Sequence, residues 1–184
     1  SDQLLELAAD AAAIIPCHTE RLRADVIERL PESVRAICSF SVGYDHIDLA
    51  AAKARGITVT NTPDVLSNAT AEIAMLLMLG AARRAHEGAH MLRTDTWADW
   101  SAVGQLGIEV TGKRLGIIGM GRVGLVTARR ARGFDMEIHY YNRHRLSPAL
   151  EAGAVFHAEL DDLLTHSQFL SIHCPATTQT HHLL

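Results

Sequence analysis

Three glycines at a fixed spacing are the residues of this sequence best suited to chemistry. Gly119, Gly121 and Gly124 follow the pattern G-x-G-x-x-G, after an apolar segment at 114–118 and before a helix predicted over 122–132. In such a turn the first glycine permits a tight bend, the second lets a pyrophosphate approach the backbone, and the third lets the helix pack closely on the strand. The pyrophosphate then binds free N–H groups at the start of the helix. The pattern predicts a dinucleotide site, the alternative being a glycine-rich turn without a ligand.

The end of the next predicted strand, at 136–141, carries the residues that choose between NAD and NADP. NAD-preferring sites place an acidic residue there, which accepts a hydrogen bond from the 2′-hydroxyl of the ribose. This sequence has Asn142, followed by Arg143 and Arg145. Because a guanidinium group can bind a 2′-phosphate with two hydrogen bonds, we expect NADP(H) to be preferred over NAD(H). The alternative is that the two arginines only form a solvated turn.

Strands and helices alternate along most of the chain, which indicates an α/β fold with parallel sheets. The first series is predicted to have strands at 11–15, 35–40 and 57–60 and helices at 19–30 and 48–55. The second series is predicted to have strands at 114–118, 136–141, 155–156 and 169–173 and helices at 122–132, 148–152 and 159–165. In the first series Asp48 is a candidate N-cap and Gly56 a candidate helix stop.

A long helix is predicted over 68–93, between the two series, and its first half is apolar on most sides. Such a helix must be buried between layers, so we expect it to bridge a partial substrate domain at 1–80 and a dinucleotide-binding domain at 81–184. The segment 94–112 that follows is polar and irregular, and it carries Trp97 and Trp100. These tryptophans either form an exposed arm or pack internally.

Composition excludes several other classes of protein. The 184 residues are 48% hydrophobic with a formal net charge of −4, and the longest uncharged apolar run is far shorter than the roughly 20 residues that span a bilayer. Aromatic residues make up only 5%, so no nucleic-acid surface is predicted. The three cysteines are widely spaced and form no CxxC pair, which predicts reduced thiols without a disulfide framework or a zinc ribbon. The eleven histidines are interpreted as binding no metal. The first residues show no basic segment followed by an apolar one, which predicts a cytoplasmic protein without a signal peptide.

Four segments in a fixed order connect this sequence to a known family. They are 41–48 (SVGYDHID), 61–72 (NTPDVLSNATAE), 112–121 (GKRLGIIGMG) and 173–180 (HCPATTQT). Together they resemble the D-isomer-specific 2-hydroxyacid dehydrogenases, and the turn at 142–145 is most similar to that of NADPH-dependent glyoxylate/hydroxypyruvate reductases. The resemblance implies a Rossmann-type doubly wound parallel sheet plus a smaller flavodoxin-like α/β substrate domain, both incomplete in this chain.

The resemblance also assigns roles to individual residues. Backbone N–H groups of Val42 and Gly43 match the loop that holds the substrate carboxylate, a suitable use of oriented amides; otherwise they form only a strand-to-helix turn. The positions that match cofactor contacts are Thr70, Gly119, Gly121, Arg122, Val123, Gly124, Asn142, Arg143, Arg145, Cys174, Pro175 and Thr180. For Cys174 a lining role is preferred to that of a reactive thiol, because no basic group is placed to lower its pKa.

The catalytic Arg, Glu and His of the family match no residue of this chain, and they are expected beyond residue 184. We therefore expect a chain truncated at both ends, from an enzyme that reduces a small 2-oxoacid such as glyoxylate or hydroxypyruvate to a D-2-hydroxyacid. The resemblance also implies a homodimer formed through the 94–112 arm. Two alternatives remain open: a phosphoglycerate-type D-hydroxyacid dehydrogenase, and a dinucleotide-sensing module that binds a cofactor without turnover.

Overall fold

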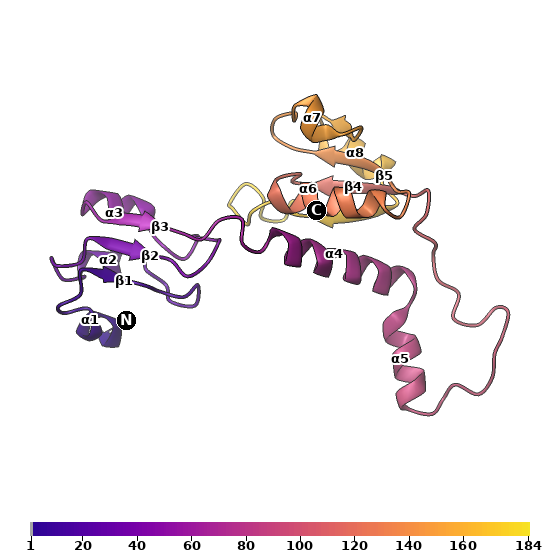
Figure 1. Ribbon diagram of the computed structural model, residues 1–184, viewed down its shortest axis with the longest axis horizontal. Coiled ribbons are helices and arrows are strands. Elements are labelled where there is room, and N and C mark those ends of the chain that lie inside the picture. The colour runs from indigo at the N-terminus through magenta and orange to yellow at the C-terminus, as the bar shows by residue number, and fades with distance from the viewer. Residues whose placement is uncertain (1) are drawn as a thin grey trace. The chain divides into compact units, whose positions relative to one another are not determined.

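The computed structural model describes residues 2–184, which form two compact units that divide between Leu66 and Ser67. Each unit is built around its own parallel sheet, as the alternation of elements predicted, so the α/β fold is confirmed (Figure 1). The division lies earlier than the predicted boundary at residue 80, because the helix that follows Leu66 packs within the second unit. Among the described residues, no helix has the length and apolar character needed to cross a bilayer.

The first unit contains a three-stranded parallel sheet in the order β1-β2-β3. Its elements are α1 (Asp2–Leu7), β1 (Ala13–Ile14), α2 (Ala24–Glu28), β2 (Ala36–Cys38), α3 (Leu49–Ala54) and β3 (Thr58–Thr60). Ile27 on α2, Ile37 on β2 and Ala52 on α3 are fully buried at its core. Removing such apolar side chains from water is the main force that holds a small sheet and its helices together.

The ends of α3 follow from the residue types on either side of it. The carboxylate of Asp48 accepts a hydrogen bond from the N–H of Ala51 at 2.9 Å, so Asp48 is the predicted N-cap. Gly56 has φ +66°, which ends the helix in a left-handed conformation that glycine adopts without strain. Both sequence predictions are confirmed, and they fix where the chain turns into β3.

The second unit contains a four-stranded parallel sheet in the order β6-β5-β4-β7. Its strands are β4 (Arg114–Ile118), β5 (Glu137–Tyr141), β6 (Val155–His157) and β7 (Phe169–Ile172), and its helices are α4 (Ser67–Ala82), α5 (Ala85–Arg93), α6 (Arg122–Arg132), α7 (Pro148–Glu151) and α8 (Leu160–His166). In chain order from β4 the strands lie 3-2-1-4, which is the Rossmann arrangement. The order reverses between β4 and β7, which places a crevice at the carboxyl ends of those two strands.

The predicted helix over 68–93 is two helices, and this prediction was wrong. Arg84 adopts φ +51° between α4 and α5, so the chain leaves the right-handed helical region for one residue. α4 packs along α6 of the second unit, with Met75 and Ala82 in the core beside Leu115 of β4. Only Ala71, Met75 and Ala82 of α4 are buried. Ile73, Leu76 and Leu77 remain exposed, so within the second unit α4 is not buried on most sides as predicted.

Candidate functional site

The first glycine of the turn lies where two strands of the second sheet come closest. Gly119 follows β4 with φ +90°, and a Cβ atom on it would lie 2.6 Å from the backbone nitrogen of Cys174, which follows β7. Real Cβ atoms do not approach that closely, so only glycine fits. The turn therefore places the end of β4 directly against the end of β7, at the point where the strand order reverses.

The other two glycines have different surroundings. A Cβ atom on Gly124 would lie 2.6 Å from the carbonyl oxygen of Gly119, so the third glycine allows α6 to pack on the turn. A Cβ atom on Gly121 would meet nothing within 4 Å. Gly121 also caps α6 without a side-chain hydrogen bond. The first N–H groups of α6, which have no acceptor within the helix, thus face space in which an anionic group can bind.

Asn142 holds the glycine turn in place. Its Oδ1 atom accepts a hydrogen bond from the N–H of Met120 at 2.7 Å, and the N–H of Gly119 donates to the carbonyl of Tyr141 at 3.0 Å. The end of β5 is therefore fastened to the turn by one side-chain and one backbone hydrogen bond. The sequence placed Asn142 where a ribose would bind, and the structure adds a positioning role that sequence reasoning missed.

A cavity of about 540 Å³ opens beside this turn, at the carboxyl ends of β4, β5 and β7. Its size lies within the usual range of ligand sites. The predicted residues that line it are Gly119, Gly121, Asn142, Arg143, Cys174, Pro175 and Thr180, and the lining residues that sequence reasoning missed are Ile118, Met120, Tyr141, His144, Leu146, His173, Thr177, Gln179 and Leu183. Ile118 and Tyr141 end β4 and β5 and His173 directly follows β7, and for these three residues the strand ends were the available signal.

Five predicted cofactor residues do not line this cavity: Thr70, Arg122, Val123, Gly124 and Arg145. Arg145 is engaged elsewhere, because its Nε atom lies 2.8 Å from Oε1 of Glu151 and its second nitrogen lies 3.1 Å from Oε2. Glu151 is buried and also accepts a hydrogen bond from the hydroxyl of Tyr140 at 2.6 Å. The bonds from Arg145 and Tyr140 lower the pKa of the Glu151 carboxyl, which keeps it ionised.

Arg143 differs from Arg145 although only one residue separates them. Arg143 is exposed, it lines the cavity, and among residues 2–184 it has no hydrogen-bond or ion-pair partner. A guanidinium group without a partner at the rim of a cavity is available for an anionic ligand. Of the two arginines predicted to bind a 2′-phosphate, only Arg143 is therefore available.

The loop after β7 closes one side of the cavity through its own hydrogen bonds. The hydroxyl of Thr180 donates to the carbonyl of Pro175 at 2.6 Å and accepts from the N–H of Thr177 at 2.8 Å. His173, at the start of this loop, lies 2.9 Å from the hydroxyl of Ser171, and burial lowers the pKa of its imidazole. Cys174 is half-buried and unpaired.

In the first unit, the loop at Val42 and Gly43 is shaped by hydrogen bonds to its carbonyl groups. Asn61 Nδ2 donates to the carbonyl of Val42 at 2.9 Å, and the hydroxyl of Ser41 donates to the carbonyl of Gly43 at 2.5 Å. Within the described part of the chain, the N–H groups of Val42 and Gly43 donate no hydrogen bond. The loop thus presents two neighbouring donors suited to a carboxylate.

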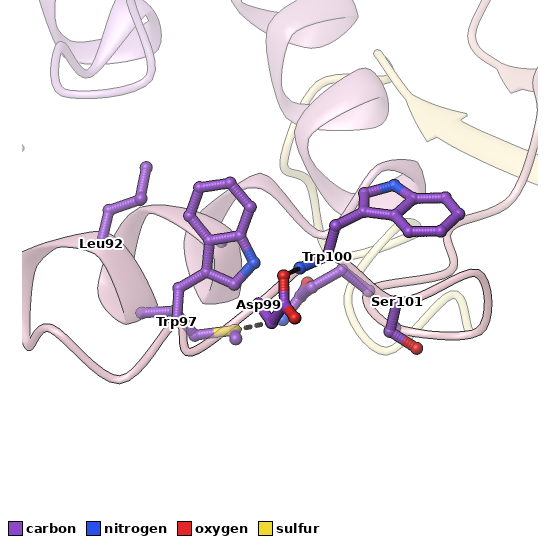
Figure 2. Close-up of a pocket in the computed structure, with 9 residues that line it drawn as sticks. Leu92, Trp97, Asp99, Trp100 and Ser101 are labelled. Atoms are coloured by element: carbon purple, nitrogen blue, oxygen red, sulfur yellow. Dashed lines mark hydrogen bonds between the residues drawn. The ribbon is translucent and has the colours of Figure 1, made fainter.

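The 94–112 segment contains no helix or strand, as predicted, and exposes both tryptophans. Trp97 is 56% and Trp100 77% exposed, so internal packing of the two rings is excluded. With Leu92 of α5 they line a second cavity of about 380 Å³ (Figure 2). Asp99 lies between the rings and accepts a hydrogen bond from the N–H of Trp100 at 2.7 Å. A large apolar area of this segment is therefore uncovered.

Comparison with known proteins agrees with this geometry. Residues 75–184 match the family model for the NAD binding domain of D-isomer specific 2-hydroxyacid dehydrogenases. The chain belongs to this family. It is 48% identical to glycerate dehydrogenase of Hyphomicrobium methylovorum, over 97% of this chain and 56% of that protein, and 42% identical to glyoxylate reductase of Thermococcus kodakarensis, over 98% of this chain and 55% of that protein.

A solved relative confirms the fold of this dehydrogenase family member. The crystal structure of a glyoxylate reductase from Paecilomyes thermophila superposes with a TM-score of 0.89 at 38% identity, covering 100% of this chain and 58% of that one. This chain therefore spans a little over half the length of the relatives that it matches. The predicted family and the Rossmann-type fold are both confirmed.

Proposed function

We propose that the protein is an oxidoreductase that transfers a hydride between NAD(P)H and a small 2-oxoacid, such as glyoxylate or hydroxypyruvate, to give a D-2-hydroxyacid. The observation that carries this proposal is the glycine turn, which opens onto a cavity at the reversal point of a Rossmann sheet. The relatives named as glycerate dehydrogenase and glyoxylate reductase support the substrate class.

Each unit contributes one part of the proposed chemistry. The N–H groups of Val42 and Gly43 bind the substrate carboxylate, which orients the neighbouring carbonyl carbon. The first turn of α6, after Gly121, binds the pyrophosphate of the cofactor. The nicotinamide supplies or accepts the hydride when the cofactor is bound. We assign no proton donor among residues 2–184.

We further propose that NADPH is preferred over NADH, through Arg143 rather than Arg145. Arg143 lines the cavity without a partner, while Arg145 is held by the buried carboxylate of Glu151. Asn142 carries no charge, so no carboxylate at this position repels a 2′-phosphate. The contribution of a hydrogen bond between charged groups is about 1.5–3 kcal/mol, which corresponds to a preference of about tenfold or more.

Cofactor titrations of the unchanged chain and two variants test this preference. Arg143→Ala is expected to weaken NADPH binding by about tenfold and to leave NADH binding almost unchanged. Arg129→Ala removes another exposed arginine, in α6 and away from the cavity lining, and serves as the control. An unchanged ratio of the two dissociation constants in Arg143→Ala would contradict the preference.

The proposed reaction is tested by adding glyoxylate, hydroxypyruvate or phosphohydroxypyruvate to protein saturated with NADPH. Loss of nicotinamide absorbance with the first two acids supports the proposal. Turnover restricted to the phosphorylated acid identifies the phosphoglycerate-type alternative. Cofactor binding without oxidation by any of the three, in the full-length protein, identifies a dinucleotide-sensing module instead.

The exposed arm at 94–112 is proposed to pair with a second copy of the chain. Trp97, Trp100 and Val103 expose more than half of their surfaces, and apolar patches of this kind mark association sites. A second copy is the occupant we favour, because most soluble oligomers are symmetric dimers of one chain. Sedimentation velocity of Trp100→Ser is expected to show a shift toward monomer, while Leu150→Ser, an exposed apolar position on α7, is not. A monomeric unchanged protein at micromolar concentration refutes the arm interface.

The cellular compartment that we propose is the cytoplasm. Cys17, Cys38 and Cys174 are all unpaired. Thiols stay reduced in that compartment, whereas secreted proteins usually pair them. Fractionation of cells that express the full-length protein tests this assignment, and recovery in an extracellular fraction would contradict it.

A further inference from the structure

A cluster of metal-capable side chains lies at the outer edge of the second sheet, away from the dinucleotide cavity. His157 ends β6, Asp162 and His166 lie one turn apart on α8, and His139 of β5 packs behind them. None of these four residues lines the cavity beside the glycine turn. No metal site was predicted from the sequence. In the structure the connection from β6 to α8 brings His157 to Asp162 and His166, and the pairing of β5 with β6 adds His139 behind them.

The side chains are close enough to share one ion. Nδ1 of His157 lies 2.6 Å from one oxygen of Asp162, and Nδ1 of His166 lies 3.3 Å from the other. One ligand atom from each of the three residues lies within 4.8 Å of the other two. Bonds of about 2.0–2.2 Å from nitrogen and oxygen to a metal place tetrahedral ligands about 3.3–3.5 Å apart. The side chains of Asp162 and His166 are about half exposed, so they can move to these separations, with the oxygen of Asp162 moving away from Nδ1 of His157.

The ring of His157 is held in the orientation that a metal ligand needs. His157 is 5% exposed, and its Nε2 atom lies 2.8 Å from Nδ1 of the buried His139. In the ion-free chain Nδ1 of His157 donates to the carboxylate of Asp162. A bound ion replaces this proton on Nδ1, and Nε2 of His157 then carries the proton and donates to Nδ1 of His139. Histidine ligands commonly donate their other N–H in this way, which fixes the tautomer and the ring direction.

The charges around the cluster permit a cation. Asp162 supplies a carboxylate between the two imidazoles, with one oxygen toward His157 and the other toward His166. Two further charges lie near His139: the carboxylate of Glu137 favours a cation and the guanidinium of Arg114 opposes it. Arg114 directs its Nε atom to the backbone carbonyl of His166 at 2.6 Å, so its hydrogen bond is made to the backbone and not to a ligand atom.

We propose that His157, Asp162 and His166 bind one divalent transition-metal ion, with water completing its coordination. Two imidazoles and one carboxylate suit Zn²⁺ and related borderline ions rather than Mg²⁺ or Ca²⁺, which prefer oxygen ligands. The ion joins β6 to α8, and it stabilises the fold at the edge of the sheet without taking part in hydride transfer. The site is independent of the proposed function.

Titration of the chelator-treated full chain with Zn²⁺ by isothermal calorimetry tests the proposal. We expect one ion per chain, together with a rise in Tm, because an ion that binds only the folded state stabilises it. Asp162→Asn retains an oxygen that can accept a hydrogen bond from His157, so the variant keeps the fold while losing the charged ligand. It is expected to weaken Zn²⁺ binding by at least about tenfold. His166→Gln is expected to do the same.

A second pair of histidines supplies the control. His86 and His90 lie four residues apart on α5, a spacing at which two imidazoles on one helix face can bind an ion. The double variant His86→Ala/His90→Ala is expected to leave the one-to-one binding and the rise in Tm intact. Loss of binding in this control, or binding that is unaffected by both Asp162→Asn and His166→Gln, would overturn the proposal. Absence of any Zn²⁺ binding by the unchanged chain would overturn it as well.

Discussion

Two loops with available backbone N–H groups, one in each unit, are built by different means. The glycine turn at 119–124 depends on residues that lack a side chain, because Cβ atoms on Gly119 and Gly124 would overlap backbone atoms at 2.6 Å. The loop at Val42 and Gly43 depends on side chains that hold its carbonyl groups, from Asn61 at 2.9 Å and from Ser41. The shape of the glycine turn depends on the absence of side chains, whereas the shape of the Val42 loop depends on side-chain hydrogen bonds to its carbonyl groups.

The comparison explains why one loop is easy to recognise in a sequence and the other is not. The constraint on the glycine turn lies within six consecutive residues, so it leaves a local pattern that carries its own physical meaning. The constraint on the Val42 loop comes from Asn61, which is nineteen positions away. No local pattern records such a contact, and only the family resemblance indicated that loop.

The largest expected effect comes from substituting within the glycine turn. Gly119→Ala combines φ +90° with overlap against the backbone of Cys174, so it is expected to destabilise the second unit by about 3 kcal/mol or more. Gly121→Ala is the matched control for folding, since open space surrounds its Cβ position. It is expected to change the free energy of unfolding by less than about 1 kcal/mol and still to weaken dinucleotide binding.

Urea denaturation and cofactor titration of both variants measure this prediction. Equal stability of Gly119→Ala and Gly121→Ala would mean that the turn relaxes around a methyl group. The shape of the turn would then not depend on the absence of a side chain at position 119. Undiminished cofactor affinity in Gly121→Ala would contradict the close approach of a pyrophosphate at that position.

A smaller effect is expected for the loop at Val42 and Gly43. Asn61→Ala removes one neutral hydrogen bond to the carbonyl of Val42, which is worth about 1 kcal/mol. The first unit should lose that much stability, and binding of a small carboxylate such as oxamate should weaken because the two N–H groups are no longer held in place. Ser33→Ala is the control, since its hydroxyl makes only a long, exposed bond of 3.4 Å to Ala9. A similar loss in both variants would contradict the role of the Asn61 hydrogen bond in holding the loop.

The smallest effect concerns acid pH and the second unit. Burial lowers the pKa of His139 and His173, so the unfolded chain takes up protons near pH 6.5 that the folded chain resists. Stability is therefore fully present above about pH 6.5 and falls as the pH drops below it, toward the folded-state pKa. Hydrogen exchange at β4, compared between pH 7 and pH 5.5 after correction for intrinsic exchange, should show this loss. His139→Gln should make the loss smaller, and an identical pH dependence in that variant would contradict the assignment.

Much of the second unit was predictable because its signals are local. The predicted bounds of β4 and α6 agree with the structure, since an apolar run, a glycine turn and Gly133 mark their ends. α1 and the break at Arg84 were missed, because neither carries a glycine, a proline or a clear change of periodicity. For the site, the cavity position followed from the motif, whereas the different fates of Arg143 and Arg145 depend on the buried Glu151.

The bond from Met120 to Asn142 has an evolutionary consequence. Codons for asparagine and aspartate differ by a single base, and the two side chains have nearly the same shape. An aspartate at position 142 could still accept from the N–H of Met120 through one oxygen and offer the other to a ribose hydroxyl. The hydrogen bond from Met120 to position 142 would remain, while the new carboxylate would repel a 2′-phosphate. One mutational step would thus reverse the proposed cofactor preference, without an intermediate in which Met120 loses its hydrogen bond to position 142.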